Sequence, residues 1–168
     1  MTEERADRPS ATIPDPIREK PRRYWDPGRR LLCTIRVYQE CGKHHDPISW
    51  CRRHIAVVAH RMWSIVTGAD IPLNTEIAGG LLIPHPNGVV IHPGVTIGPN
   101  CLIFQQVTLG AGAGEGMPKI GGHVDIGAGA KILGPVMIGD HAKIGANAVV
   151  LQDVPAGATA VGIPARII

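Results

Sequence analysis

The sequence predicts a mainly β protein, in which a short α-helical N-terminal segment precedes a parallel β-helix built from hexapeptide repeats. Two observations support this fold class. An aliphatic residue recurs at every sixth position through most of the C-terminal part of the chain. Glycine (21 residues) and proline (15) are also abundant, while aromatic residues make up only 4% of the chain. The core must therefore use small and aliphatic side chains joined by many turns, as a hexapeptide solenoid does.

The hexapeptide register is clearest from the aliphatic residues themselves. They are Ile91, Ile97, Ile103, Leu109, Ile120, Ile126, Ile132, Ile138, Ile144 and Val150. Small or branched residues lie four positions after most of them, and glycine often follows directly. Three hexapeptides close one triangular coil, so these residues are expected to stack in an interior column, with glycine at the tight corners. The helices cap one end of the stack and the terminal stretch "VGIPARII" caps the other.

The repeat is interrupted in two places. Ile83 and Ile91 are eight positions apart, which puts two extra residues into "IPHPNGVV". Leu109 and Ile120 are eleven apart, which leaves the glycine-rich stretch 110–119 as an excursion. Insertions in a repeat fold project from one face, and function usually collects there.

The chain is expected to divide into three parts. We expect residues 1–23, which are charged and contain several prolines, to form a disordered arm. Residues 24–68 form the α-helical segment, and residues 69–168 form the β-helix domain.

Two helices are expected in the α-helical segment. The first covers about residues 28–41. The second begins with Asp46 as N-cap and Pro47 in the first turn, and ends at Gly68. Its expected apolar face consists of Ile48, Cys51, Ile55, Val58, Met62 and Ile65.

Composition and charge exclude several classes of function. The net charge of +3 comes from the N-terminal third and lacks interleaved aromatic residues, so no nucleic-acid partner is expected. We find no secretory signal and no apolar run of about 18 residues, which argues against a membrane span. Four cysteines without a secretory signal indicate reduced thiols and a cytoplasmic location.

The first irregularity carries the main candidate for chemistry. Asp70 opens the first coil and His85 follows fifteen residues later, so the two can lie near one edge of adjacent coils. A carboxylate that holds one imidazole nitrogen orients the other as a general base near neutral pH. The alternative is a surface histidine in a turn, and position alone does not separate the two interpretations.

Several sequence blocks resemble the catalytic half of serine acetyltransferases. The blocks are "ADIPLNTEIAGGLLIPHPNGVVI", "VTLG", "IGAGAKILGPVMIGDHAKIGANAVVL" and "GIPARI", which together span roughly residues 68–168. The resemblance implies a left-handed parallel β-helix that uses acetyl-CoA as co-substrate. It also implies that His85 is the general base, that Asp70 supports it, and that a homotrimer forms active sites between neighbouring subunits.

The resemblance also directs attention to residues that could hold the coenzyme. A pantetheine arm needs little side-chain bulk beneath it, and its phosphates need cations. A backbone N–H near Gly110 could stabilise the oxyanion. The predicted coenzyme-binding residues are Gly110, Lys119, Gly127, Ala128, Lys143, Gly145, Ala146 and Arg166.

Two departures from the family pattern bear on the acceptor. Serine acetyltransferases commonly have Asp before the catalytic histidine and a second histidine before "PKI", whereas this chain has Pro84 and Met117. L-Serine, acetylated for cysteine biosynthesis, remains the first predicted substrate. The alternative is a sugar hydroxyl in surface or exopolysaccharide biosynthesis.

The sequence contains two sets of residues that could bind zinc, but no metal is expected. Cys41, His44, Cys51 and His54 have ligand types that could hold zinc, but a buried thiol at Cys51 explains that residue more simply. A zinc hydratase of the γ-carbonic-anhydrase kind would need His85, His92 and His123 to converge between subunits, and their spacing does not follow the repeat. His123 and His141 are expected to be solvated at outward positions.

Overall fold

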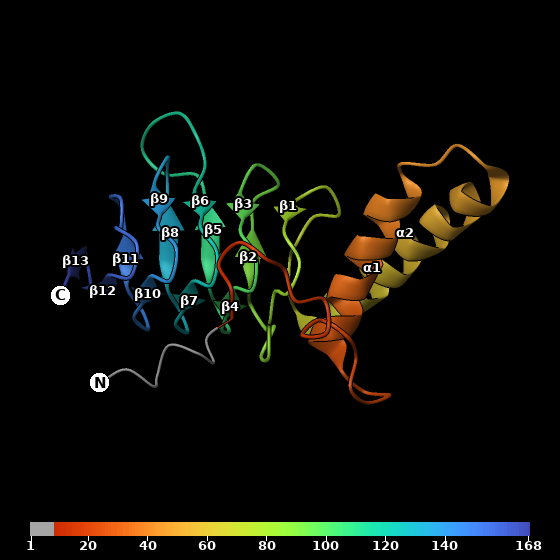
Figure 1. Cartoon of the computed structure of the whole chain (residues 1–168), viewed down its shortest axis with the longest axis horizontal. Coiled ribbons are helices and arrows are strands. Elements are labelled where there is room, and N and C mark those ends of the chain that lie inside the picture. The colour runs from red at the N-terminus through yellow and green to blue at the C-terminus, as the bar shows by residue number, and fades with distance from the viewer. Residues whose placement is uncertain (1–8) are drawn as a thin grey trace.

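The structure is a computed structural model, and it describes residues 9–168. Two helices lie at one end, and a parallel β-helix with three faces forms the rest (Figure 1). The predicted order of a helical segment followed by a β-helix is therefore confirmed. No helix within the described range is long and apolar enough to cross a membrane.

The three faces are three sheets, here named A, B and C. Face A contains β2 (Val90–Ile91), β5 (Thr108–Gly110), β8 (Lys131–Leu133) and β11 (Val149–Val150). Face B contains β1 (Glu76–Ile77), β3 (Thr96–Ile97), β6 (Lys119–Ile120) and β9 (Met137–Ile138). Face C contains β4 (Leu102–Ile103), β7 (Asp125–Ile126), β10 (Lys143–Ile144), β12 (Thr159–Gly162) and β13 (Ala165–Ile167). All neighbours pair in parallel except β13, which turns back antiparallel to β12 at the C-terminal end.

The register stacks identical repeat positions inside the solenoid. On face B, for example, Ile97 pairs with Ile77 on one side and Ile120 on the other. Every predicted aliphatic position from Ile91 to Val150 is buried, and so is the residue four positions after each of them, except Ala113 in the glycine-rich excursion. Burial of each such isoleucine contributes about 2–3 kcal/mol. The interior column predicted from the six-residue period is confirmed.

The corners between faces form three edges, each named by the faces it joins in chain order. The C–A edge contains residues 84–88, 104–107, 127–130 and 145–148. The A–B edge contains residues 72–75, 92–95, 110–118, 134–136 and 151–153, and so includes the last residue of β5. The B–C edge contains residues 78–81, 98–101, 121–124, 139–142 and 155–158. At the C–A edge, successive coils place Gly88, Gln106, Gly129 and Asn147 at positive φ. These residues make the same left-handed turn in every coil.

Helix α1 (Pro27–Cys41) caps the solenoid and buries Leu31, Leu32 and Ile35 in its core. Helix α2 (Pro47–Thr67) begins and ends as predicted. Its cap Asp46 accepts a hydrogen bond from the Ser49 N–H, and Gly68 follows at positive φ.

The side chains of the predicted apolar face of α2, including Cys51, are exposed. This face therefore does not pack against the core. Ile48 is 72% exposed and Ile65 is 83% exposed. The buried residues of α2 are instead Ala56, His60 and Thr67. The buried thiol expected at Cys51 is therefore wrong.

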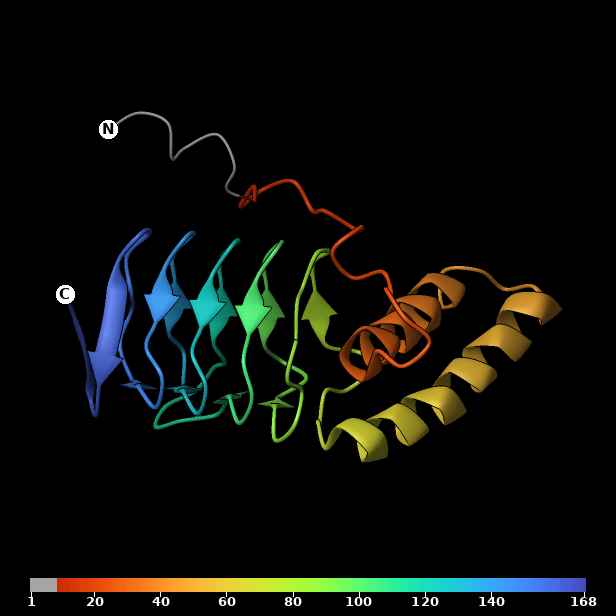
Figure 2. The same ribbon diagram turned by 90° about the horizontal axis from the view of Figure 1, so that it is seen from below.

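Residues 9–20 lie along the B–C edge, as Figure 2 shows, and differ from the disordered arm expected for the first 23 residues. The buried amide of Asn100 accepts a hydrogen bond from the Asp15 N–H and donates to the carbonyls of Ser10 and Ile13. Glu19 accepts a hydrogen bond from the Leu81 N–H. Residues 1–8 of the expected arm lie outside the described residues.

Candidate active site

His85 lies on the C–A edge, in a turn that both helices hold in place. The Gly88 N–H donates to the carbonyl of Gly68, just beyond α2. A Cβ on Gly28, in the first turn of α1, would lie 2.4 Å from the Ile83 carbonyl oxygen, so α1 packs directly on the backbone before the turn. The imidazole of His85 is exposed. The first insertion therefore presents a histidine to solvent on a fixed backbone.

Asp70 lies on face A, one coil before Val90, with which its backbone pairs. It is thus close to the same edge as His85, on the adjacent coil, as the repeat predicted. Within residues 9–168, no hydrogen bond or ion pair joins the two side chains. The charge of Asp70 acts instead on His60 of α2. The imidazole of His60 is buried and hydrogen-bonded to Thr34 at 3.2 Å. Burial lowers the pKa of His60, and the charge of Asp70 opposes this shift.

His92 lies on a different edge, A–B, and its ring nitrogen is already engaged. The Gly94 N–H donates to Nδ1 of His92 at 3.1 Å. Nδ1 is therefore the acceptor, and the neutral ring carries its proton on Nε2. In this state neither nitrogen is available to abstract a proton, whereas His85 has no such constraint.

The four small residues predicted to line the coenzyme groove all lie on the C–A edge, in line with His85. Gly127 and Ala128 belong to one coil, and Gly145 and Ala146 belong to the next. Stacking explains the first of the two glycines, because a Cβ on Gly127 would lie 2.6 Å from the Ala146 nitrogen. Ala128 is half-buried and Ala146 is exposed, so both methyl groups contribute to the surface. These two coils therefore offer little side-chain bulk at the C–A edge.

The predicted cations are spread over the faces. Lys143 lies on face C just before the C–A edge, and Arg166 lies on β13 of the same face. Lys119 lies on face B, away from that edge. The repeat explains this: Lys119 and Lys143 are four hexapeptides apart, which is one more than a full coil, so they fall on neighbouring faces.

Sequence reasoning missed Lys131, which occupies the same repeat position as Lys119 and Lys143. It lies on face A, and its Nζ donates to the Gln106 carbonyl on the C–A edge. The repeated "KI" dipeptide was the signal that could have identified it.

Gly110 and the glycine-rich excursion lie on the A–B edge, where Figure 1 shows the loop between β5 and β6 projecting from the solenoid. Gly110 is buried, and its carbonyl accepts a hydrogen bond from the Gly134 N–H at 2.9 Å. Met117 closes the excursion and packs partly against the core. Face A separates this edge from His85, so a single chain does not bring Gly110 and His85 together.

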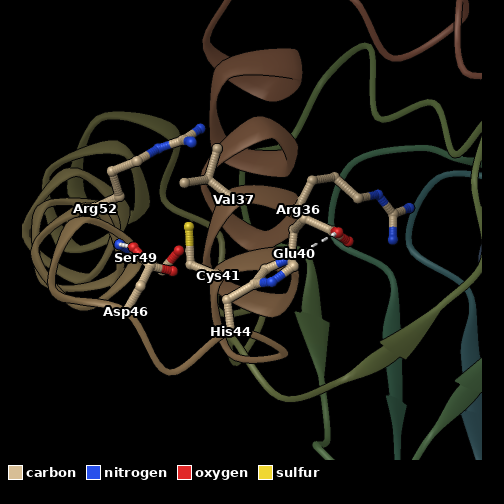
Figure 3. A pocket seen from close by; sticks show the side chains of 8 residues that line it. All are labelled: Arg36, Val37, Glu40, Cys41, His44, Asp46, Ser49 and Arg52. Carbon is tan, nitrogen blue, oxygen red and sulfur yellow. Dashed lines mark hydrogen bonds and ion pairs between the residues drawn. The ribbon is translucent and has the colours of Figure 1, made fainter.

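Neither zinc hypothesis gains a converging ligand set. His85, His92 and His123 lie on three different edges of the solenoid. Cys41 and His44 line a pocket between the two helices, together with Asp46 and Arg52 (Figure 3). Cys51, by contrast, is exposed. Within residues 9–168, no group of three or more His, Cys, Asp or Glu side chains is placed to hold a metal ion.

Comparisons with known proteins agree with this architecture. Residues 117–152 match the family model described as bacterial transferase hexapeptide (six repeats). The serine acetyltransferase of Synechococcus elongatus is 44% identical over 145 residues, which cover 84% of this chain and 57% of that protein. The enzyme of Mycobacterium tuberculosis is 42% identical over 143 residues, which cover 82% of this chain and 62% of that protein. The chain thus spans about three fifths of the length of these curated relatives.

Solved structures extend the likeness to three dimensions. A serine acetyltransferase in complex with CoA superimposes with a TM-score of 0.72 at 35% identity, covering 86% of this chain and 58% of that one. The soybean serine acetyltransferase apoenzyme gives a TM-score of 0.63 at 36% identity, covering 83% of this chain and 69% of that one. These matches support the left-handed winding predicted for the β-helix. The chain belongs to the serine acetyltransferase-like family of hexapeptide-repeat acyltransferases.

Proposed function

We propose that this chain is an acetyl-CoA-dependent O-acetyltransferase with L-serine as its acceptor and His85 as its general base. One observation carries the proposal. His85 and the small residues Gly127, Ala128, Gly145 and Ala146 lie along one edge of the solenoid, on stacked coils. An exposed imidazole then shares its edge with two coils that offer a pantetheine arm little side-chain bulk. The similar proteins are named serine acetyltransferases, and one of the similar structures is titled as a complex with CoA.

The proposed reaction is a direct transfer. His85 takes the proton from the acceptor hydroxyl while that oxygen attacks the thioester carbonyl carbon. The carbon–sulfur bond then breaks, and the CoA sulfur leaves and takes up a proton, so no acyl-enzyme forms. We assign Asp70, on the adjacent coil, to the support of His85. Lys143 and Lys131 flank the C–A edge, and we assign them to the coenzyme phosphates together with Arg166.

The proposed site requires more than one copy of the chain. The backbone N–H near Gly110 that we assign to the oxyanion lies on the A–B edge, whereas His85 lies on the C–A edge. We therefore infer a homotrimer in which the C–A edge of one subunit faces the A–B edge of its neighbour. The cytoplasmic location predicted from the sequence stays a prediction.

Release of CoA from acetyl-CoA, followed with a thiol reagent, tests the activity. L-Serine is expected to support turnover, and His85→Ala should lower kcat by roughly 10²–10⁴-fold. His45→Asn is the matched control, since it removes an exposed imidazole from the loop between the two helices, and should retain near-normal turnover. Near-normal activity of His85→Ala would reject the assignment.

A mixing experiment tests the shared site. His85→Ala subunits are unfolded and refolded with subunits of an inactive Gly110→Val variant, each inactive alone. If each site takes His85 from one chain and Gly110 from the next, some mixed trimers contain an intact site and activity returns. Absence of any recovery, in trimers shown by mass to be mixed, contradicts a site shared between subunits.

A sugar acceptor remains the second candidate because of one observation. Met117 occupies the position where the family pattern has a second histidine, and its side chain packs partly into the core beside Gly94. Pro84 likewise replaces the aspartate before His85. The same assay with nucleotide sugars and oligosaccharides in place of serine separates the two acceptors. Turnover with a sugar and none with serine would replace L-serine in the proposal.

A further inference from the structure

Two histidines that the proposed function does not use are stacked on the B–C edge. His123 and His141 are 18 residues apart and occupy the same corner position in consecutive coils. Their Nδ1 atoms lie 2.9 Å apart, and the two rings meet edge to face at a centroid distance of 5.0 Å. This edge is distinct from the C–A and A–B edges that carry the proposed acetyltransferase residues.

The backbone at both positions is in the left-handed region. The φ angles are 51° at His123 and 60° at His141. Other coils place Gly80, Asn100 and Gly157 at the equivalent corner, and glycine and asparagine are the residues that adopt this conformation most readily. A histidine there costs about 1 kcal/mol relative to glycine. Because backbone strain of this kind tends to occur at functional sites, its presence at the same corner of two consecutive coils indicates a shared role for the two imidazoles.

We propose that His123 and His141 form a two-nitrogen site for a divalent transition metal ion, with Cu²⁺ the ion that fits best. Imidazole nitrogens bind such ions at about 2.0–2.1 Å, so two ligands at a right angle lie about 2.9 Å apart. The observed separation of the Nδ1 atoms is 2.9 Å. Right-angled nitrogen ligands suit the tetragonal geometry of Cu²⁺ and Ni²⁺, and Cu²⁺ binds more strongly in the divalent series.

The charges around the pair favour a cation. Asp140 precedes His141, and its Oδ1 accepts a hydrogen bond from the N–H of Gly122, next to His123. Asp125 lies two residues after His123, at the start of β7. Among residues 9–168, the guanidinium of Arg18 opposes them from the Asn100 corner of the same edge. Since no third side-chain ligand converges within the described residues, water completes the coordination and the affinity is lower than in a three-ligand site.

Without metal, the short Nδ1 contact is a hydrogen bond in which one ring donates and the other accepts. Metal binding needs both Nδ1 atoms unprotonated, so the donating ring moves its proton to Nε2. Metal binding therefore replaces the hydrogen bond between the two rings.

The test is a Cu²⁺ titration of the full chain without a histidine tag, followed by calorimetry and by electron paramagnetic resonance. Wild type is expected to bind one tight Cu²⁺ per chain, with two equatorial nitrogens in the spectrum. The test variant is His141→Asn, because asparagine already occupies this backbone conformation at Asn100. It should weaken the tight site roughly tenfold or more.

The matched control is His92→Asn, which removes an exposed imidazole outside the pair and should leave Cu²⁺ affinity unchanged. Thermal unfolding of both variants checks that each is folded. Equal Cu²⁺ affinity of wild type and a folded His141→Asn variant would overturn the proposal, as would a spectrum with fewer than two equatorial nitrogens. None of these measurements uses acetyl transfer, so the result does not depend on the proposed function.

Discussion

Asn100 offers a direct test of how the N-terminal segment is held. Its side chain is 1% exposed and makes three hydrogen bonds to residues 10–15, at 2.7–2.8 Å. Its φ of 60° makes glycine the substitution that keeps the backbone unstrained. Asn100→Gly therefore removes the amide without adding a conformational cost. At about 0.5–1.5 kcal/mol per net hydrogen bond, the expected loss is about 2–4 kcal/mol.

The loss has an upper limit, because the segment can detach while the solenoid remains folded. The variant should then lose the free energy of docking the segment and no more. The amide of Asp15, which donates to Asn100, should exchange its hydrogen much faster in the variant. Hydrogen exchange and urea unfolding measure the local and the global effect separately.

Asn147→Gly is the matched control for Asn100→Gly. Asn147 has nearly the same φ, 56°, but it is exposed on the C–A edge and does not contact the segment. Its replacement should change stability by less than about 0.5 kcal/mol. If Asn100→Gly matches Asn147→Gly in both stability and exchange at Asp15, the amide does not hold the segment and the reasoning is refuted.

Three further predictions follow from single residues. Burial raises the pKa of the Cys101 thiol to about 11, so a thiol reagent at pH 8 should label the exposed Cys33 and Cys51 quickly but Cys101 only after denaturation. Burial lowers the pKa of His60 below its usual 6.5. The stability that the neutral, buried imidazole contributes is therefore fully present above pH 6.5 and is lost as the pH falls below it. The variant His60→Gln should accordingly flatten the dependence of Tm on pH between pH 5 and 7. A Cβ on Gly98 would lie 2.5 Å from the Gly121 carbonyl carbon, so Gly98→Ala should cost about 1–3 kcal/mol in urea unfolding, whereas Gly42→Ala, with its nearest contact at 3.4 Å, should be tolerated.

The solenoid could be predicted because the sequence pattern that specifies it is short and recurs in every hexapeptide. Each hexapeptide specifies one strand and one corner, and every copy confirms the register of the others. The inward positions from Ile91 to Val150 could therefore be predicted individually, and all are buried. The two ends of helix α2 were predictable for the same reason, because the neighbouring residues Asp46 and Gly68 determine them.

Contacts between distant segments were not predictable in this way. The segment that contains Asp15 is ordered by Asn100, 85 residues away, through an amide that only a left-handed corner can present. Composition alone indicated disorder. The exposed apolar side of α2 was misjudged for a related reason: helical periodicity shows that Ile48 and Ile65 share a side, but not whether this chain supplies anything to cover it.

The candidate site divides along the same line. His85 was identified because it interrupts the repeat, and counting coils placed Asp70 near it. The same six-residue count also determines the edges. Gly110 begins the corner after face A, whereas His85 precedes that face. Lys119, Lys131 and Lys143 fall on three different faces.

The placement of His85 and Gly110 on different edges constrains the symmetry of any active assembly. A twofold dimer that meets edge to edge makes an isologous contact, in which an edge meets the same edge of its partner. Such an edge-to-edge contact pairs His85 with His85 and leaves Gly110 elsewhere. A ring of three makes heterologous contacts, in which one edge meets a different edge of the next subunit. In the proposed trimer, three triangular solenoids lie with their axes parallel, and every C–A edge faces an A–B edge. Among edge-to-edge assemblies, the division of the proposed site between two edges therefore favours the ring over the pair.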